Sequence, residues 1–151
     1  MYIRVMKPEQ TFDFHIRKTW IQIFKMYNDL VTEQGLTTSL GMALLNIDIK
    51  EGTRSTALGP KMGMESTSLS RLLKSMEAQD LIVKESDPSD KRSVVLKLTK
   101  AGIEKRNVAR SVVLKFNQSI VSEIGAERTK EFLNTMEDIN NVIEKLRAPA
   151  E

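Results

Sequence analysis

The sequence predicts a mainly α fold (α+β) in which one β-hairpin interrupts a series of helices. Apolar residues recur at spacings of three and four over most of the chain, as they do along one face of an α-helix. Two short runs rich in β-branched residues, 81–85 and 94–98, flank a polar, turn-forming loop. We therefore expect four helices, then the hairpin, and then two further helices.

The first two expected helices each end at a glycine. The first runs from about Thr11 to Glu33 and stops at Gly35, and the second runs from about Ser39 to Lys50 and stops at Gly52. The apolar residues that define the first are Ile16, Trp20, Ile23, Phe24, Tyr27, Leu30 and Val31. Those that define the second are Leu40, Ala43, Leu44 and Ile47.

The third expected helix is short, and a fourth follows it. We expect Ser55 to be the N-cap of the third helix, and Pro60 to leave that helix distorted or very short, because proline lacks a backbone donor. The fourth begins at Glu65 or Ser66 and ends near Gln79. One face of this fourth helix carries short polar side chains and cationic side chains. Its apolar face consists of Leu69, Leu72, Leu73 and Met76.

Two longer helices are expected after the hairpin. Thr99 is placed to cap the first of them, and Gly125 separates it from the last. The apolar residues of the first are Val108, Val112, Phe116, Ile120 and Ile124. Those of the last are Phe132, Met136, Ile139, Ile143 and Leu146.

Three helices followed by a β-hairpin is the order of a winged helix-turn-helix, a fold in which one helix enters the major groove of DNA. Lys91 and Arg92 on the hairpin loop can reach the minor groove, which attracts arginine where it is narrow. Asp90 has two interpretations: it orients a neighbouring arginine, or it only starts the turn. The full set of candidate DNA-contacting residues is Ser66, Thr67, Ser68, Ser70, Arg71, Lys74, Asp90, Lys91 and Arg92.

Basic charge gathers in the same part of the chain. The formal net charge is only +3, but the segment from Lys50 to Arg110 holds 13 Lys or Arg residues and eight Asp or Glu residues. Such a concentration is expected of a segment that meets phosphates, although a solvated basic face has the same composition.

The hairpin and its flanks resemble a known family. The run Asp90-Lys91-Arg92-Ser93-Val94-Val95-Leu96-Lys97-Leu98-Thr99-Lys100-Ala101-Gly102 resembles the wing signature of MarR-type regulators: Asp, any residue, Arg, alternating apolar residues, Leu-Thr, and Gly three residues after Thr. Residues 66–73 resemble that family's recognition helix, and residues 55–63 resemble the helix and turn before it. The matching core covers about 37–102.

The resemblance implies one domain over 1–151, with a winged-helix lobe at 37–102 and dimerisation helices at 11–35 and 103–147. It further implies a transcriptional repressor that binds a palindromic operator in double-stranded DNA as a homodimer. Three positions depart from the family pattern. Ser75 stands where many relatives have a second arginine, Asp80 replaces the glycine that usually closes the recognition helix, and Pro60 is unusual in the preceding helix.

Members of this family often release DNA when a small phenolic or lipophilic effector binds. In this chain the candidate effector-binding residues are His15, Trp20, Phe24, Tyr27 and Met42. An aromatic stripe at helical spacing is also what the core of a subunit interface looks like, so both interpretations stand.

Composition argues against several other classes. The chain has no cysteine and one histidine, and it has no glycine-rich phosphate loop, so we expect no metal site, no cofactor and no enzymatic activity. No apolar run reaches the roughly 18 residues of a membrane span, and Met1–Gln10 does not resemble a signal peptide, so we expect a cytoplasmic protein. The alternative is a winged helix used for protein assembly, which predicts an apolar or acidic exposed recognition face.

Overall fold

The computed structural model describes residues 7–148. Met1–Met6 lie outside the described residues. They form part of the Met1–Gln10 segment, in which we expect no signal peptide. The chain divides into two compact units, Met1–Val112 and Val113–Glu151. The elements, in chain order, are the 3-10 helix η1 (Pro8–Gln10), α1 (Phe12–Val31), the 3-10 helix η2 (Thr32–Gln34), α2 (Thr38–Asn46), β1 (Thr53–Arg54), α3 (Ser55–Met62), α4 (Ser66–Ala78), β2 (Ile82–Ser86), β3 (Val94–Leu98), α5 (Lys100–Ile124) and α6 (Ala126–Arg147).

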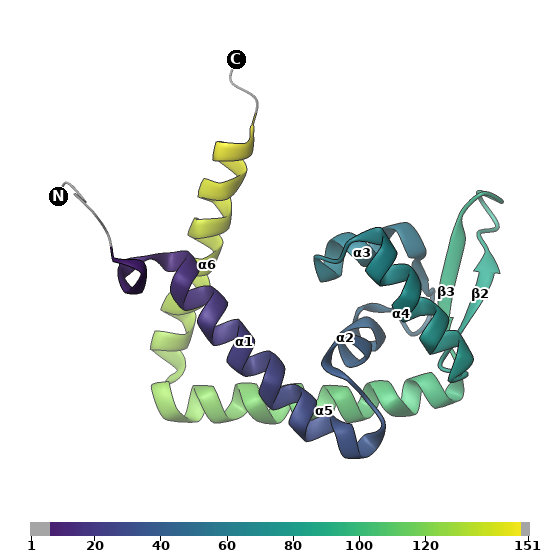
Figure 1. The fold of residues 1–151 in the computed structure, drawn as a ribbon, viewed down its shortest axis with the longest axis horizontal. Helices are drawn as coiled ribbons and strands as arrows, with labels where there is room; N and C mark the ends of the chain where they lie inside the picture. The colour runs from purple at the N-terminus through teal and green to yellow at the C-terminus, as the bar shows by residue number, and fades with distance from the viewer. Residues whose placement is uncertain (1–6, 149–151) are drawn as a thin grey trace. The chain divides into compact units, whose positions relative to one another are not determined.

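The expected series of helices around one hairpin is confirmed (Figure 1). None of the described helices is long and apolar enough to cross a lipid bilayer. The hairpin belongs to a three-stranded antiparallel sheet in the order β1-β3-β2. Strands β2 and β3 pair from Ile82–Leu98 to Ser86–Val94, and Arg54 of β1 lies opposite Val95. We did not expect β1, because a strand of two residues has no periodicity to detect.

Two expected helix boundaries were wrong. Helix α2 ends at Asn46, four residues earlier than expected, because Ile47 is extended and Asp48 closes a turn by accepting hydrogen bonds from the N–H groups of Lys50 and Glu51 at 2.8 and 2.7 Å. The N-cap of α3 is Arg54 and not Ser55, which is the first helical residue. Helix α3 is very short, as expected, and ends two residues after Pro60.

The hydrophobic core of the first unit lies among α2, α3, α4 and the sheet. Helix α4 packs against α2 and β2, and α3 packs against α2 and β3 (Figure 1). Val108 and Val112 of α5 pack against this core, as expected. The buried members are Val31, Leu36, Leu40, Ala43, Leu44, Ile47, Leu58, Leu69, Leu73, Met76, Leu81, Ile82 and Leu96.

The junction between α4, the sheet and α5 is tightly built. Thr99 caps α5, as expected, since its hydroxyl accepts a hydrogen bond of 2.9 Å from the N–H of Gly102. The same hydroxyl donates to the carbonyl of Asp80 at 2.6 Å, and the N–H of Thr99 donates to the carbonyl of Leu81 at 3.1 Å. Asp80 has a φ of 55°, the left-handed backbone that the missing glycine would otherwise provide.

Helix α6, in the second unit, leaves its apolar stripe exposed in the single chain. Phe132, Ile143 and Leu146 are exposed by 58%, 44% and 80%. A helix gains most of its stability in a protein by burying such a face, so this stripe indicates a surface that another element covers.

Candidate nucleic-acid interface

Helix α4 presents a polar, cationic face to solvent. Leu69, Leu73 and Met76 anchor its other face in the core, and this fixes the direction of the exposed side chains. Glu65, the N-cap, makes no side-chain hydrogen bond to the first turn, so N–H groups at this end can donate hydrogen bonds to an anion. The exposed candidates are Ser66, Thr67, Ser68, Ser70, Arg71 and Lys74.

The tip of the hairpin is closed by a network of backbone hydrogen bonds. The N–H of Asp87 donates to the carbonyl of Ser93 at 3.0 Å, and the N–H of Ser93 donates to the carbonyl of Asp90 at 2.8 Å. The Asp90 carboxylate accepts from the backbone N–H of Arg92 at 3.0 Å. The expected pairing of Asp90 with an arginine side chain is not formed within residues 7–148, so in the free protein Asp90 shapes the turn.

Four cationic candidates are exposed and take part in none of the ion pairs found within residues 7–148. They are Arg71, Lys74, Lys91 and Arg92. By contrast, Lys84 of β2 pairs with Glu77 of α4 at 2.5 Å, which ties the hairpin to the helix. Basic groups that are exposed and have no carboxylate partner are suited to meet phosphates or base edges.

The hairpin of β2, β3 and the loop between them is the wing of the fold. Sequence reasoning missed a cluster that anchors the base of this wing. Asp87 is buried, and its carboxylate accepts a hydrogen bond from Arg54 Nε at 2.8 Å and lies 2.6 Å from Arg54 Nη2. Its other oxygen accepts from the hydroxyl and the N–H of Ser89 at 2.7 and 2.8 Å. The cluster therefore joins the start of α3 to the hairpin loop. The Asp-Pro-Ser order indicates the local turn, but nothing in the sequence pairs Asp87 with a residue 33 positions earlier.

This cluster predicts a specific dependence of stability on pH. Hydrogen bonds from the Ser89 hydroxyl and N–H, together with Arg54, lower the pKa of Asp87 to about 2. Because the folded-state pKa is depressed, the stabilisation is complete above the unfolded-state pKa near 4 and is lost as the pH falls toward 2. We expect the difference in unfolding free energy between the wild type and Asp87→Asn to shrink across this window in urea titrations. Parallel curves for the two proteins from pH 5 to 2 would contradict this assignment.

The candidate effector residues lie on α1 and α2. The rings of Trp20 and Phe24 meet edge to face with centroids 5.9 Å apart, and Trp20 is 44% exposed. His15 Nε2 lies 2.7 Å from the carbonyl oxygen of Glu9, and burial raises the pKa of Tyr27. Met42 is half-buried on α2.

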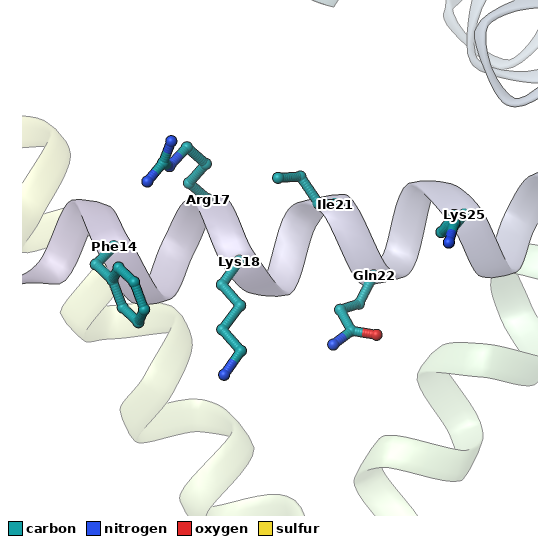
Figure 2. Close-up of a pocket in the computed structure, with 6 residues that line it drawn as sticks. All are labelled: Phe14, Arg17, Lys18, Ile21, Gln22 and Lys25. Atoms are coloured by element: carbon teal, nitrogen blue, oxygen red, sulfur yellow. The ribbon is translucent and has the colours of Figure 1, made fainter. Parts of the chain in front are cut away.

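A hollow also runs along α1, but none of the five candidate effector residues lines it. Its lining residues all come from this one helix, so the hollow is an open surface and not a cage (Figure 2). They are Phe14, Arg17, Lys18, Ile21, Gln22 and Lys25. The role of His15, Trp20, Phe24, Tyr27 and Met42 in effector binding stays a prediction. Among residues 7–148, no three His, Cys, Asp or Glu side chains gather in a way that could hold a metal ion.

Residues 36–94 match the model of the MarR family, and this span contains α2, α3, α4 and the wing loop. This segment of the chain is therefore similar to the MarR family. The HTH-type transcriptional regulator SarZ of Staphylococcus epidermidis is 28% identical to this chain over 124 residues, which span 82% of this chain and 80% of SarZ.

Solved structures show the same winged-helix fold. The S. aureus MepR–DNA complex has a TM-score of 0.79 at 18% identity and covers 87% of this chain and 98% of MepR. The PcaV transcriptional regulator of Streptomyces coelicolor, in complex with its natural ligand, has a TM-score of 0.76 at 17% identity and covers 91% and 96% of the two chains. In this chain the Ser75 hydroxyl, at the position where many MarR-type regulators have a second arginine, accepts a hydrogen bond from the Gln79 side chain at 3.0 Å.

Proposed function

We propose that this protein is a sequence-specific transcriptional repressor that binds a palindromic operator as a homodimer and is not an enzyme. The observation that carries the proposal is that one lobe presents two unpaired cationic features, the exposed face of α4 and the wing tip. Two similar proteins support the proposal: SarZ is named as a transcriptional regulator, and MepR was solved in complex with DNA. A winged helix used for protein assembly would show an apolar or acidic face at α4, whereas the face contains Thr67, Arg71 and Lys74.

In this proposal α4 enters the major groove and the wing follows the backbone into the minor groove. Small side chains such as Thr67 and Ser70 allow close approach, and Arg71 can donate two hydrogen bonds to a guanine or a phosphate. Arg92 enters the minor groove at the edge of the site. The Arg54–Asp87 ion pair holds the base of the wing against the start of α3. In this proposal the wing and α4 therefore contact the DNA as one rigid unit.

A second copy of the chain is the proposed partner for the exposed apolar stripes. On α6 the stripe repeats at alternating spacings of three and four residues, the spacing at which helices interlock with one another. Exposed apolar residues on α1, such as Phe12 at 70% and Trp20 at 44%, belong to the expected dimerisation helices. Two reading heads in one dimer place their α4 helices in successive major grooves about one helical turn apart.

We further propose that the repressor acts in the cytoplasm by blocking polymerase and that a small phenolic or lipophilic effector releases it. The complex of PcaV with its natural ligand supports ligand response in this fold. An effector releases DNA only if it binds the free conformation more tightly than the DNA-bound one.

The test is a selection of bound sequences from a random duplex pool, followed by titration of the selected site at several salt concentrations. We expect an inverted repeat with half-sites about 10 base pairs apart, as two-fold symmetry requires. The logarithm of affinity should fall with the logarithm of salt concentration with a slope steeper than about −5, since each neutralised phosphate contributes about −0.9. Weak binding with no sequence preference would overturn the proposal in favour of the assembly module.

A further inference from the structure

A groove in the first unit lies between the two cationic features of the candidate interface. It measures about 520 Å³ and is formed by α3, the turn after it, one side of α4 and both strands of the wing. Helix α3 packs against β3, and α4 packs against β2, so these elements form its walls (Figure 1). Its lining includes Ser55, Thr56, Ser70, Lys74, Lys84 and Val94.

Two lysines line this groove from different elements. Lys74 belongs to α4 and Lys84 belongs to β2. Lys74 is exposed and forms no ion pair with any described residue, whereas Lys84 Nζ lies 2.5 Å from Glu77 Oε2 on α4. Both side chains of this pair are 37% exposed, and an exposed ion pair in water contributes little to stability. Lys84 can therefore leave Glu77 for another anionic partner at low cost.

The rest of the lining suits a chain of sugars and phosphates. The hydroxyls of Thr56 and Ser70 make no hydrogen bond with any other described residue, so they are free to donate to phosphate oxygens. Val94 lines the groove beside them and is 37% exposed, which offers an apolar contact to a deoxyribose ring. A small inorganic anion would use the cations and leave this apolar surface in water.

The position of the groove identifies the DNA backbone as the occupant. In the proposed function α4 lies in the major groove and the wing tip reaches the adjacent minor groove. One sugar-phosphate strand separates these two grooves of a duplex, so that strand must cross between α4 and the wing. The hollow lined by Lys74 and Lys84 lies between these same two elements.

We propose that this groove holds one phosphate of the DNA backbone, bound by Lys74 and Lys84, and that Glu77 competes with this phosphate for Lys84. The inference rests on the proposed function and adds to it a contact residue, Lys84, and an acid that opposes binding. In the free protein Glu77 neutralises Lys84; on DNA, Lys84 turns to the phosphate and Glu77 is left facing solvent. Because breaking the ion pair opposes every complex, Glu77 limits the part of the affinity that does not depend on sequence.

The competition is tested by fluorescence anisotropy on the selected operator with four full-length proteins: the wild type, Lys84→Gln, Glu77→Gln and the double variant. Glu77→Gln should raise the affinity about three- to fivefold when Lys84 is present, and clearly less when Lys84 is replaced. Lys84→Gln should lower the affinity about tenfold in the Glu77→Gln background, and less than that in the wild type. Equal effects of each substitution in both backgrounds would refute the competition.

The ion pair between Lys97 and Glu85 is a matched control. It joins β3 to β2 with 2.7 Å between Lys97 Nζ and Glu85 Oε2, its side chains are 43% and 50% exposed, and neither residue lines the groove. The same comparison with Lys97→Gln and Glu85→Gln should give additive effects, because no phosphate displaces this acid. Equal coupling in the two pairs would mean that the net charge of the wing causes it, and would overturn the groove site. All of these variants should fold, because each replaced side chain is at least 37% exposed.

Single methylphosphonate substitutions in the operator locate the bound phosphate, because each removes the charge of one phosphate. At the phosphate that occupies the groove, the substitution should weaken binding of the wild type about tenfold. The variant that combines Lys74→Gln with Lys84→Gln should lose little at that position, and should lose as much as the wild type at the other contacted phosphates. If no position showed a loss that depends on these two lysines, the phosphate site would be wrong.

A duplex of random sequence separates this inference from the proposed function. A phosphate contact carries no sequence information, so the coupling between Glu77 and Lys84 should appear on this duplex as well. Coupling in a chain that prefers no sequence would defeat the proposed function and leave the phosphate site standing. Sequence-specific binding without coupling would defeat the phosphate site and leave the proposed function standing.

Discussion

Gly102→Ala is expected to destabilise the protein strongly, although alanine is the better helix former. A Cβ at this position would lie 2.0 Å from the carbonyl oxygen of Leu81 and 3.0 Å from its carbonyl carbon. That carbonyl also accepts the hydrogen bond from Thr99, so it cannot withdraw without breaking the junction between the sheet and α5. Overpacking of this kind costs about 3 kcal/mol, and the substitution should lower the unfolding free energy in urea by that amount.

The sign of this effect separates two explanations. Gly102 lies in the first turn of α5, where helix propensity alone predicts that alanine stabilises the helix by at most about 1 kcal/mol. The control is Gly63→Ala, at a position with open space around it and a φ of 61°, where only backbone strain of about 1–2 kcal/mol is expected. If Gly102→Ala were as stable as the wild type, or no more damaging than Gly63→Ala, the close approach of α5 to the sheet would be refuted.

Arg92→Ala is expected to weaken operator binding by about 10- to 100-fold, the range of one specific arginine contact. Arg92 is exposed at the wing tip. The turn that presents it is held by the Asp90 carboxylate, which accepts a hydrogen bond from the backbone N–H of Arg92. Because the narrow minor groove of A·T-rich DNA attracts arginine most strongly, the loss should be greater for A·T-rich flanks than for G·C-rich flanks. Fluorescence anisotropy on duplexes that differ only in these flanks measures both effects.

A charge-matched control distinguishes a contact from a general loss of positive charge. Arg110→Ala removes an exposed arginine of α5 that lies outside the candidate interface, so it should change operator affinity little. Equal losses in the two variants would mean that Arg92 contributes only to the overall field. Unchanged affinity in Arg92→Ala would remove the wing from the interface.

The sequence alone predicted the elements whose evidence is local. The spacing of Leu69, Leu73 and Met76 predicts both the helix and the face it buries, so the exposed positions of Thr67 and Arg71 follow from periodicity. The Thr99 cap and the left-handed Asp80 are likewise decided within a few residues of chain. Such features are predictable because a residue and its neighbours along the chain fix the backbone geometry between them.

Only the tertiary structure decided the features that join distant segments. Strand β1 exists because Thr53 and Arg54 meet Leu96 and Val95, the wing is anchored because Arg54 meets Asp87, and Gly102 is constrained because the Leu81 carbonyl lies against it. Each of these pairs depends on how the core packs, and no periodic pattern along the chain encodes a contact between two residues that tens of positions separate.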